Sequence, residues 1–143
     1  MNIVLVIIIL IVGFFVLNKL VVDNKVNSAK SKLGHLRVSE KFKAIIDTIT
    51  EQDVFFHDYR VVNVSPIQDN LCSLSHSNVI VLLTFYEEKI HLEWKYKFFQ
   101  KEVVRKFSHP VDNFTEQEQI QFASMAFKEM QQAIREHQTG MGF

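Results

Sequence analysis

The sequence is poor in the residues that characterise several common protein classes. Its 143 residues include one cysteine, four glycines and two prolines, and 16 basic residues balance 16 acidic ones. A single cysteine excludes an internal disulfide framework and a cysteine-rich zinc site. The low glycine and proline content excludes collagen-like or low-complexity chain. Because the formal net charge is zero, we expect no nucleic-acid partner.

Motifs of the familiar enzyme classes are also missing. The chain contains no G-x-S-x-G elbow, no Walker loop, no G-x-G-x-x-G, no H-E-x-x-H and no paired-cysteine motif. The sequence therefore predicts no cofactor and no metal site, and it favours a protein that is not an enzyme without deciding the question.

One long hydrophobic run is the strongest feature of the sequence. Residues 3–17 read IVLVIIILIVGFFVL, without a charge. A helix over residues 3–22 rises about 30 Å, the thickness of the hydrocarbon core of a bilayer. A buried core helix would show a polar stripe, and a cleaved signal peptide would begin with basic residues and end at a small-residue cleavage site. Because the run shows none of these features, we predict an uncleaved single-pass membrane anchor over residues 1–22.

Basic residues follow this run. The positive-inside rule places them in the cytoplasm, so we expect the N-terminus outside and the C-terminal domain in the cytoplasm. Residues 23–37 are predicted to form a basic juxtamembrane linker, as a continuation of the helix or as a flexible tether. Their side chains could bind anionic headgroups or remain solvated. The residues expected at the membrane surface are Lys19, Lys25, Lys30, Lys32 and Arg37.

The next segments change from a helical to a strand period. Ser39 fits a helix N-cap, and apolar residues from Val38 to Ile49 recur at helical spacing. Residues 54–64 and 79–86 are rich in β-branched and aromatic side chains and predict strands, the second one central and covered on both faces over part of its length. The polar residues 65–78 predict a loop.

Two further strands and a helix complete the predicted domain. Residues 89–99 predict a strand in which apolar and polar side chains alternate from Ile90 to Phe98. Residues 102–108 predict an edge strand whose charges would discourage edge-to-edge pairing. Thr115 and Glu118 match a capping box. An apolar seam follows, which we expect to pack on the sheet rather than on a partner helix. The seam consists of Ile120, Ala123, Phe127, Met130 and Ile134.

These elements predict an α+β fold. An N-terminal transmembrane helix precedes a two-layer domain over residues 38–137, in which an antiparallel meander of three or four strands packs against two helices in the order α-β-β-β-(β)-α. Residues 138–143 are expected to be a disordered tail.

Few residues are candidates for chemistry. His91 and Glu93 lie two apart on the polar face of one predicted strand, so both could reach a ligand, although a solvated strand face has the same pattern. His57 and Asp58 interrupt an apolar strand, but adjacent strand residues point to opposite faces. These four side chains are weak catalytic candidates.

The sequence leaves three functions open. We expect an accessory or scaffold subunit of a membrane assembly, whose cytoplasmic domain binds a protein through its exposed strand face or its C-terminal helix. The alternatives are a membrane-tethered enzyme with an unidentified His and carboxylate site, and a domain that binds a lipid or another apolar ligand between sheet and helices, suggested by 13 phenylalanines.

Overall fold

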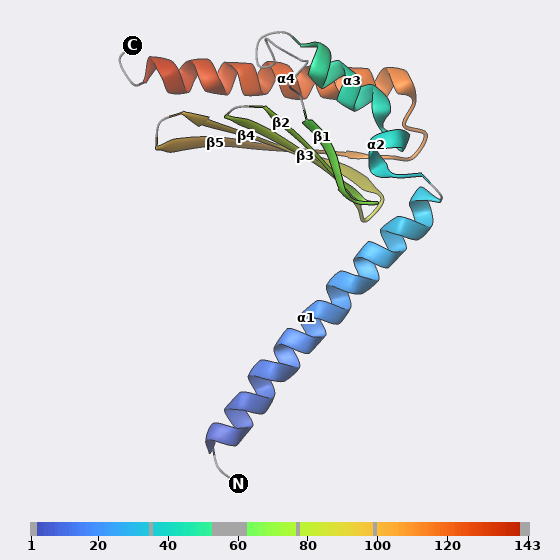
Figure 1. The fold of residues 1–143 in the computed structure, drawn as a ribbon, viewed down its shortest axis with the longest axis vertical. Coiled ribbons are helices and arrows are strands. Elements are labelled where there is room, and N and C mark those ends of the chain that lie inside the picture. Colours follow the sequence, from blue (N-terminus) through green and yellow to red (C-terminus); the bar gives the residue numbers. More distant parts are fainter. Residues whose placement is uncertain (1–2, 35, 53–62, 77, 99, 141–143) are drawn as a thin grey trace.

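A long helix and a sheet covered by helices make up the protein. The computed structural model describes residues 3–34, 36–52, 63–76, 78–98 and 100–140 (Figure 1). The helices are α1 (Ile3–Leu33), α2 (Val38–Lys41), α3 (Lys43–Glu51) and α4 (Glu116–Thr139). The strands are β1 (Asn63–Gln68), β2 (Leu71–His76), β3 (Val79–Tyr86), β4 (Lys89–Phe98) and β5 (Lys101–Pro110). The α+β class and the long apolar N-terminal helix are confirmed.

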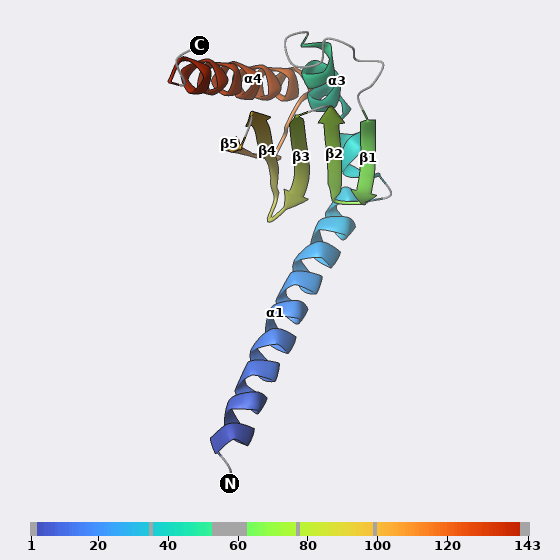
Figure 2. The same cartoon turned by 60° about the vertical axis from the view of Figure 1, so that its left-hand side comes forward.

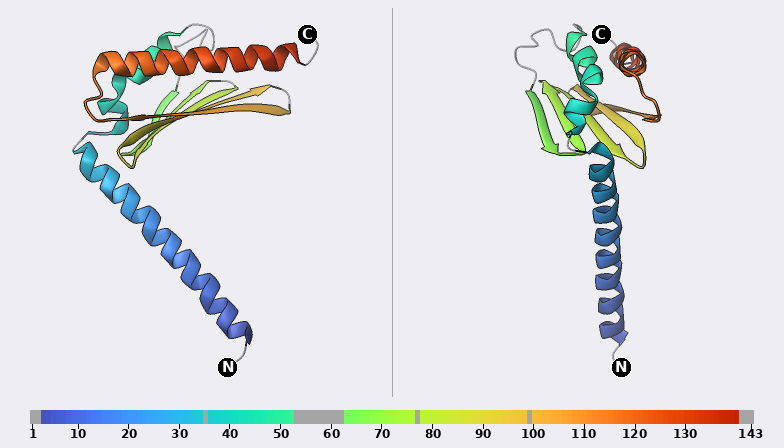
Figure 3. Two further views of the ribbon diagram at one scale, coloured as in Figure 1. Left: turned by 180° about the vertical axis from the view of Figure 1, so that it is seen from behind. Right: turned by 90° about the vertical axis from the view of Figure 1, so that its right-hand side faces the viewer.

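The strands form one antiparallel meander. Each strand pairs with its neighbours in the chain, giving the sheet order β1-β2-β3-β4-β5. α3 and α4 cover one face of this sheet, and α1 extends away on the other side (Figures 1 and 3). The two-layer arrangement therefore leaves one face of the sheet without a covering helix among the described residues.

The core lies between the covered face and the helices. On β3 and β4 every second side chain points into it, including Val81, Leu83, Leu92 and Trp94. The Trp94 ring lies 6.0 Å from that of Phe127 on α4. The predicted seam of α4 thus packs on the sheet. Figure 2 shows α4 on the opposite side of the sheet from α1.

α4 begins and ends close to the expected residues. The backbone N–H of Glu118 donates to Thr115 Oγ1 at 3.3 Å, and the Thr115 N–H donates to Glu118 Oε2 at 2.8 Å, so the predicted capping box is present. Ile120 was expected in the seam but is exposed, because the buried stripe runs through Phe122 and Ala126 instead. The helix continues through Thr139, two residues beyond the predicted domain end, and residues 141–143 lie outside the described part.

The helical segment before the sheet is divided in two. Ser39 lies inside α2 and is not its N-cap; the cap is Arg37, whose N–H donates to Glu40 Oε2 at 2.8 Å. The helix is interrupted at Phe42, which has non-helical backbone angles, before α3 begins. The apolar period from Val38 to Ile49 is nevertheless correct, because those side chains are buried.

The predicted loop over residues 65–78 is wrong. This segment forms most of β1 and all of β2, joined by a turn at Asp69 and Asn70. Within the described residues the sheet therefore has five strands, where three or four were expected. Of the predicted strand over residues 54–64, residues 53–62 lie outside the described part, and Asn63 and Val64 begin β1.

α1 is one continuous helix that includes most of the predicted anchor (residues 1–22) and most of the predicted linker (residues 23–37). It runs to Leu33, so residues 23–33 continue the apolar helix rather than forming a flexible tether. Gly34 follows with φ +69°, a left-handed conformation that glycine adopts without strain and that commonly ends helices.

Candidate functional site

The uncovered face of the sheet holds two of the four candidate residues. His91 and Glu93 lie on β4, and both point to the face opposite the core, as the alternation predicted. They lie next to a depression of about 150 Å³ whose lining also includes Thr84, Tyr86 and Lys106. His57 and Asp58 lie outside the described residues, so the structure does not test them.

His91 is held as a packed, mainly neutral side chain. Its ring stacks on that of Tyr86, with centroids 3.8 Å apart and planes 11° from parallel. Burial lowers the pKa of His91, and a hydrogen bond with the Tyr86 backbone opposes that shift in part. Its Nε2 atom is buried and has no hydrogen-bond partner. The His91 ring is therefore a packed part of this sheet face and not the base of an acid–base pair.

Glu93 belongs to an ion-pair network. Its carboxylate oxygens lie 2.9 Å from Lys95 Nζ and 3.3 Å from Lys106 Nζ. The hydrogen bond with Lys95, followed by that with Lys106, lowers the pKa of Glu93. The carboxylate is thus ionised and neutralised by two lysines, and it gives His91 no proton relay.

The rest of this open face is polar with an apolar centre. Serines on β2 border one side and lysines on β4 the other. Between them, Ile80 on β3 is 42% exposed, and Leu82 beside it is half-buried. We define the open face by Ser73, Ser75, Ile80, Leu82, Thr84, Tyr86, His91, Glu93, Lys95, Lys97, Glu102, Val104 and Lys106.

Basic residues of α1 contact acidic residues at the sheet turns. Lys25 Nζ lies 2.5 Å from Glu87 Oε1, and Lys32 pairs with Glu88. Both acids occupy the turn between β3 and β4 and have positive φ angles, 51° and 60°, which are uncommon for side chains other than glycine and asparagine. Hydrogen bonds with these lysines, and then their charge, lower the pKa of Glu87 and of Glu88.

The turn between β1 and β2 receives the remaining pairs. Asp69 lies 3.7 Å from Lys30 Nζ and 3.9 Å from Arg37 Nε, measured to its carboxylate oxygens. Four of the five cations predicted at the membrane surface therefore have acidic partners within the protein. Ala29 and Leu33 on the same end of α1 are buried in the core, so this end of the helix is packed onto the domain.

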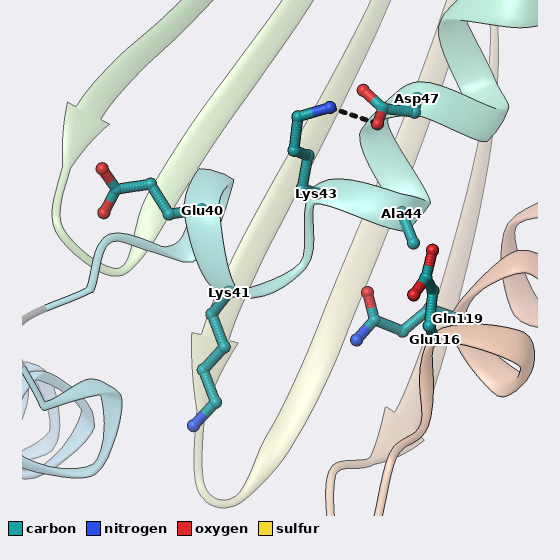
Figure 4. Close-up of a pocket in the computed structure, with 7 residues that line it drawn as sticks. All are labelled: Glu40, Lys41, Lys43, Ala44, Asp47, Glu116 and Gln119. Carbon is teal, nitrogen blue, oxygen red and sulfur yellow. Dashed lines mark hydrogen bonds and ion pairs between the residues drawn. The ribbon is translucent and has the colours of Figure 1, made fainter.

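A second depression lies between α2, α3 and the start of α4 (Figure 4). Its volume is about 360 Å³. Glu116 and Gln119 extend from α4 toward Ala44, while Lys43 pairs with Asp47. The Gln119 amide donates to the Phe114 carbonyl at 3.5 Å. No local sequence pattern predicts this depression, because its residues lie far apart in the chain and meet only through the packing of α3 on α4.

Neither depression has the donor set of a familiar catalytic centre. Among the described residues, no group of three or more His, Cys, Asp or Glu side chains could hold a metal ion. Cys72 is fully buried, and burial raises the pKa of its thiol, so its thiolate is disfavoured.

The described residues define an α+β domain that carries one exposed apolar helix. Within them, α1 is the helix long and apolar enough to cross a membrane, and none of its most apolar stretch is buried. Comparisons with known protein families, with curated protein sequences and with solved structures find no match for this chain.

Proposed function

We propose that this chain is a single-pass membrane protein whose cytoplasmic α+β domain binds a protein partner through the open face, as an accessory or scaffold subunit of a membrane assembly. Residues 3–22 of α1 are the membrane span in this proposal. The proposal rests above all on the surroundings of α1, which has an exposed apolar part and a packed basic part.

The apolar part of α1 needs a hydrophobic environment. Sixteen large apolar side chains between Ile3 and Val22 are exposed. At roughly 0.3 to 0.6 kcal/mol each, their transfer into a bilayer is favourable by about 5 to 10 kcal/mol. A soluble core helix would have most of these side chains buried, whereas here the domain covers none of the most apolar stretch.

The basic residues of α1 support a cytoplasmic domain. Lys25, Lys30 and Lys32 follow the span, and Lys19 lies in its last turn. Topology is set during insertion by the lysines and arginines near the span. Their pairing with Glu87, Glu88 and Asp69 in the folded domain therefore leaves the orientation argument intact.

The open face supports partner binding better than catalysis. The His91 ring is stacked and the Glu93 carboxylate is neutralised, so these two candidates lack the geometry of an acid–base pair. Trp94, Phe42 and Phe85 fill the space between sheet and helices and are almost fully buried, which gives a lipid-binding function less support. An exposed isoleucine among paired charges suits a protein surface with complementary groups.

Site-specific photocrosslinking in native membranes tests the partner surface. A photoreactive residue at Ile80, on the open face, is expected to capture a discrete partner that is identified by mass spectrometry. The same residue at Met125, which is 45% exposed on α4, is the matched probe for the alternative surface. Capture from Met125 alone would move the interface to α4, and capture from neither position would remove the proposed binding function.

Cysteine labelling tests the orientation. A Thr139→Cys variant in intact cells should react with a membrane-impermeant maleimide only after permeabilisation. The native Cys72 is buried and provides an internal control that stays unlabelled until the protein unfolds. Labelling of Thr139→Cys before permeabilisation would show that the domain lies outside the cytoplasm.

A further inference from the structure

No described strand pairs with the outer edge of β5. At this edge the exposed Arg105 side chain donates to the Val104 carbonyl at 3.0 Å, a contact that exchanges for a backbone hydrogen bond when another strand pairs there. Tyr86 and Lys89 flank a two-residue turn, and such flanking residues exchange both hydrogen bonds. Counting from this pair, the odd-numbered residues of β4 bond to β3 and the even-numbered ones to β5. In β5, the residues whose N–H and C=O groups point outward are therefore Glu102, Val104, Lys106 and Ser108.

The side chains along this edge are arranged symmetrically about Val104. Glu102 lies two residues before it and Lys106 two residues after it, and all three point to the open face. When a second copy of β5 pairs antiparallel with Val104 opposite Val104, Glu102 of each copy faces Lys106 of the other. Both charge pairs are then attractive, and all the paired backbone groups are those that point outward.

The neighbouring registers bring like charges together. If Val103 lies on the axis, Lys101 lies opposite Arg105. If Arg105 lies on the axis, the two copies of Arg105 lie opposite each other. If Lys106 lies on the axis, the two copies of Lys106 lie opposite each other. Like charges directly opposite each other destabilise a sheet. The edge charges thus disfavour three symmetric registers and favour the one centred on Val104, whereas the sequence alone predicts that these charges discourage edge-to-edge pairing altogether.

We propose that the chain forms a symmetric dimer in which β5 of one copy pairs with β5 of a second copy, with Val104 on the two-fold axis. The two sheets become one continuous sheet of both copies.

Because the axis of such a pair is perpendicular to the sheet, each face of the joined sheet combines the same face of both copies. α1 leaves the domain on the side away from α4 (Figures 1 and 3), so both α1 helices leave on the same side and can enter one bilayer. This dimer adds to the proposed function and uses the β5 edge rather than the centre of the open face.

Charge exchange tests the register in the full-length chain. We expect Glu102→Lys, and separately Lys106→Glu, to weaken dimerisation in detergent or nanodiscs about tenfold or more, since each places like charges opposite each other twice. The double variant loses the ion pair between Lys106 and Glu93 but recovers both pairs between the copies, so it should dimerise more strongly than Lys106→Glu alone, measured by light scattering or mass photometry. A loss of dimer that the double variant fails to rescue would overturn this register, and a monomeric wild-type chain would overturn the dimer.

Disulfide crosslinking tests the geometry without depending on affinity. Residues opposite each other in a bonded antiparallel pair have Cα atoms about 5.5 Å apart, within the range of a disulfide. Val104→Cys should therefore form covalent dimers in oxidised membranes. Ser108→Cys is the matched control, because the two copies of that residue would lie about 27 Å apart. Crosslinking of Ser108→Cys at the same yield, or none from Val104→Cys, would contradict the proposal.

Discussion

The first 20 residues of α1 and its last 11 belong to one continuous helix, yet their side chains meet different surroundings. Between Ile3 and Val22 the helix exposes large apolar groups on every side. From residue 23 onward it presents lysines to the acidic turns of the sheet and buries Ala29 and Leu33. The helix therefore continues across residue 22, but the environment that suits its side chains changes there. Before residue 22 they require an apolar environment, and after it they pack on the domain.

Charges in the middle of the apolar half should have the largest effect. Replacing Ile9 and Val12 together with arginine costs insertion about 6 to 8 kcal/mol on the biological scale, which offsets most of the favourable transfer. We expect the variant to leave the membrane fraction on carbonate extraction. Asn24→Arg with Ser28→Arg, on the exposed surface of the basic half, is the matched control and should stay in the membrane. Equal extraction of both variants would abolish the distinction between the two halves.

Truncation of a buried side chain in the basic half should destabilise the domain. Leu33 is 4% exposed, and removing its buried methyl groups leaves a cavity, so Leu33→Ala should lower the free energy of unfolding by about 2 to 5 kcal/mol. Denaturant unfolding followed by the fluorescence of Trp94, the single tryptophan, measures this change in detergent. Leu20→Ala, in the exposed half, should leave the domain's stability almost unchanged. A similar loss from both variants would mean that the domain also depends on the apolar half.

The ion pairs between α1 and the β3–β4 turn should have the smallest effect and a defined pH range. Because the pKa values of Glu87 and Glu88 are lowered in the folded protein, pairing stabilises the contact above their ordinary value near 4.5 and is lost as pH falls through the lower folded values. Pairing also raises the pKa of Lys25 from its ordinary value of 10.5. The stabilisation that Lys25 contributes is therefore fully present below pH 10.5 and is lost as the pH rises through the raised pKa. The contact should therefore be constant across neutral pH.

Carboxyl titration by NMR separates the two pairs. Lys25→Gln should raise the pKa of Glu87 toward its ordinary value and leave Glu88 unaffected, and Lys32→Gln should do the reverse. High salt should reduce both shifts, because the pairs are exposed. Unchanged titration of Glu87 in Lys25→Gln would show that the pair does not persist in solution.

Much of the fold could be predicted from local patterns in the sequence. The uninterrupted apolar run, the alternation along β4 and the capping box at Thr115 each depend on residues close in sequence, and each was predicted. β2 was missed although Cys72 and Leu74 alternate with Ser73 and Ser75, because the serines and the nearby asparagine and aspartate gave the segment the composition of a loop. The turn at Asp69 and Asn70 was the signal for a hairpin that the composition obscured.

The site was less predictable because it depends on register and packing. Alternation placed His91 and Glu93 on one face, but the pairing of Glu93 with Lys106 requires the alignment of β4 with β5. The partners of Lys25 and Lys32 could not be inferred at all, since no local pattern brings a helix of the N-terminus beside the turn at Glu87 and Glu88.

The uninterrupted course of α1 has a mechanical consequence. A helix of this length forms a rod of about 46 Å, and its last turns are fixed to the sheet by burial and by charge rather than joined to it by a loose tether. The domain and the helix then rotate together as a lever. In the proposed topology, a thinner or thicker bilayer that changes the tilt of the span would swing the far end of the sheet toward or away from the lipid surface. Membrane thickness would then set how much of the open face the proposed partner can reach.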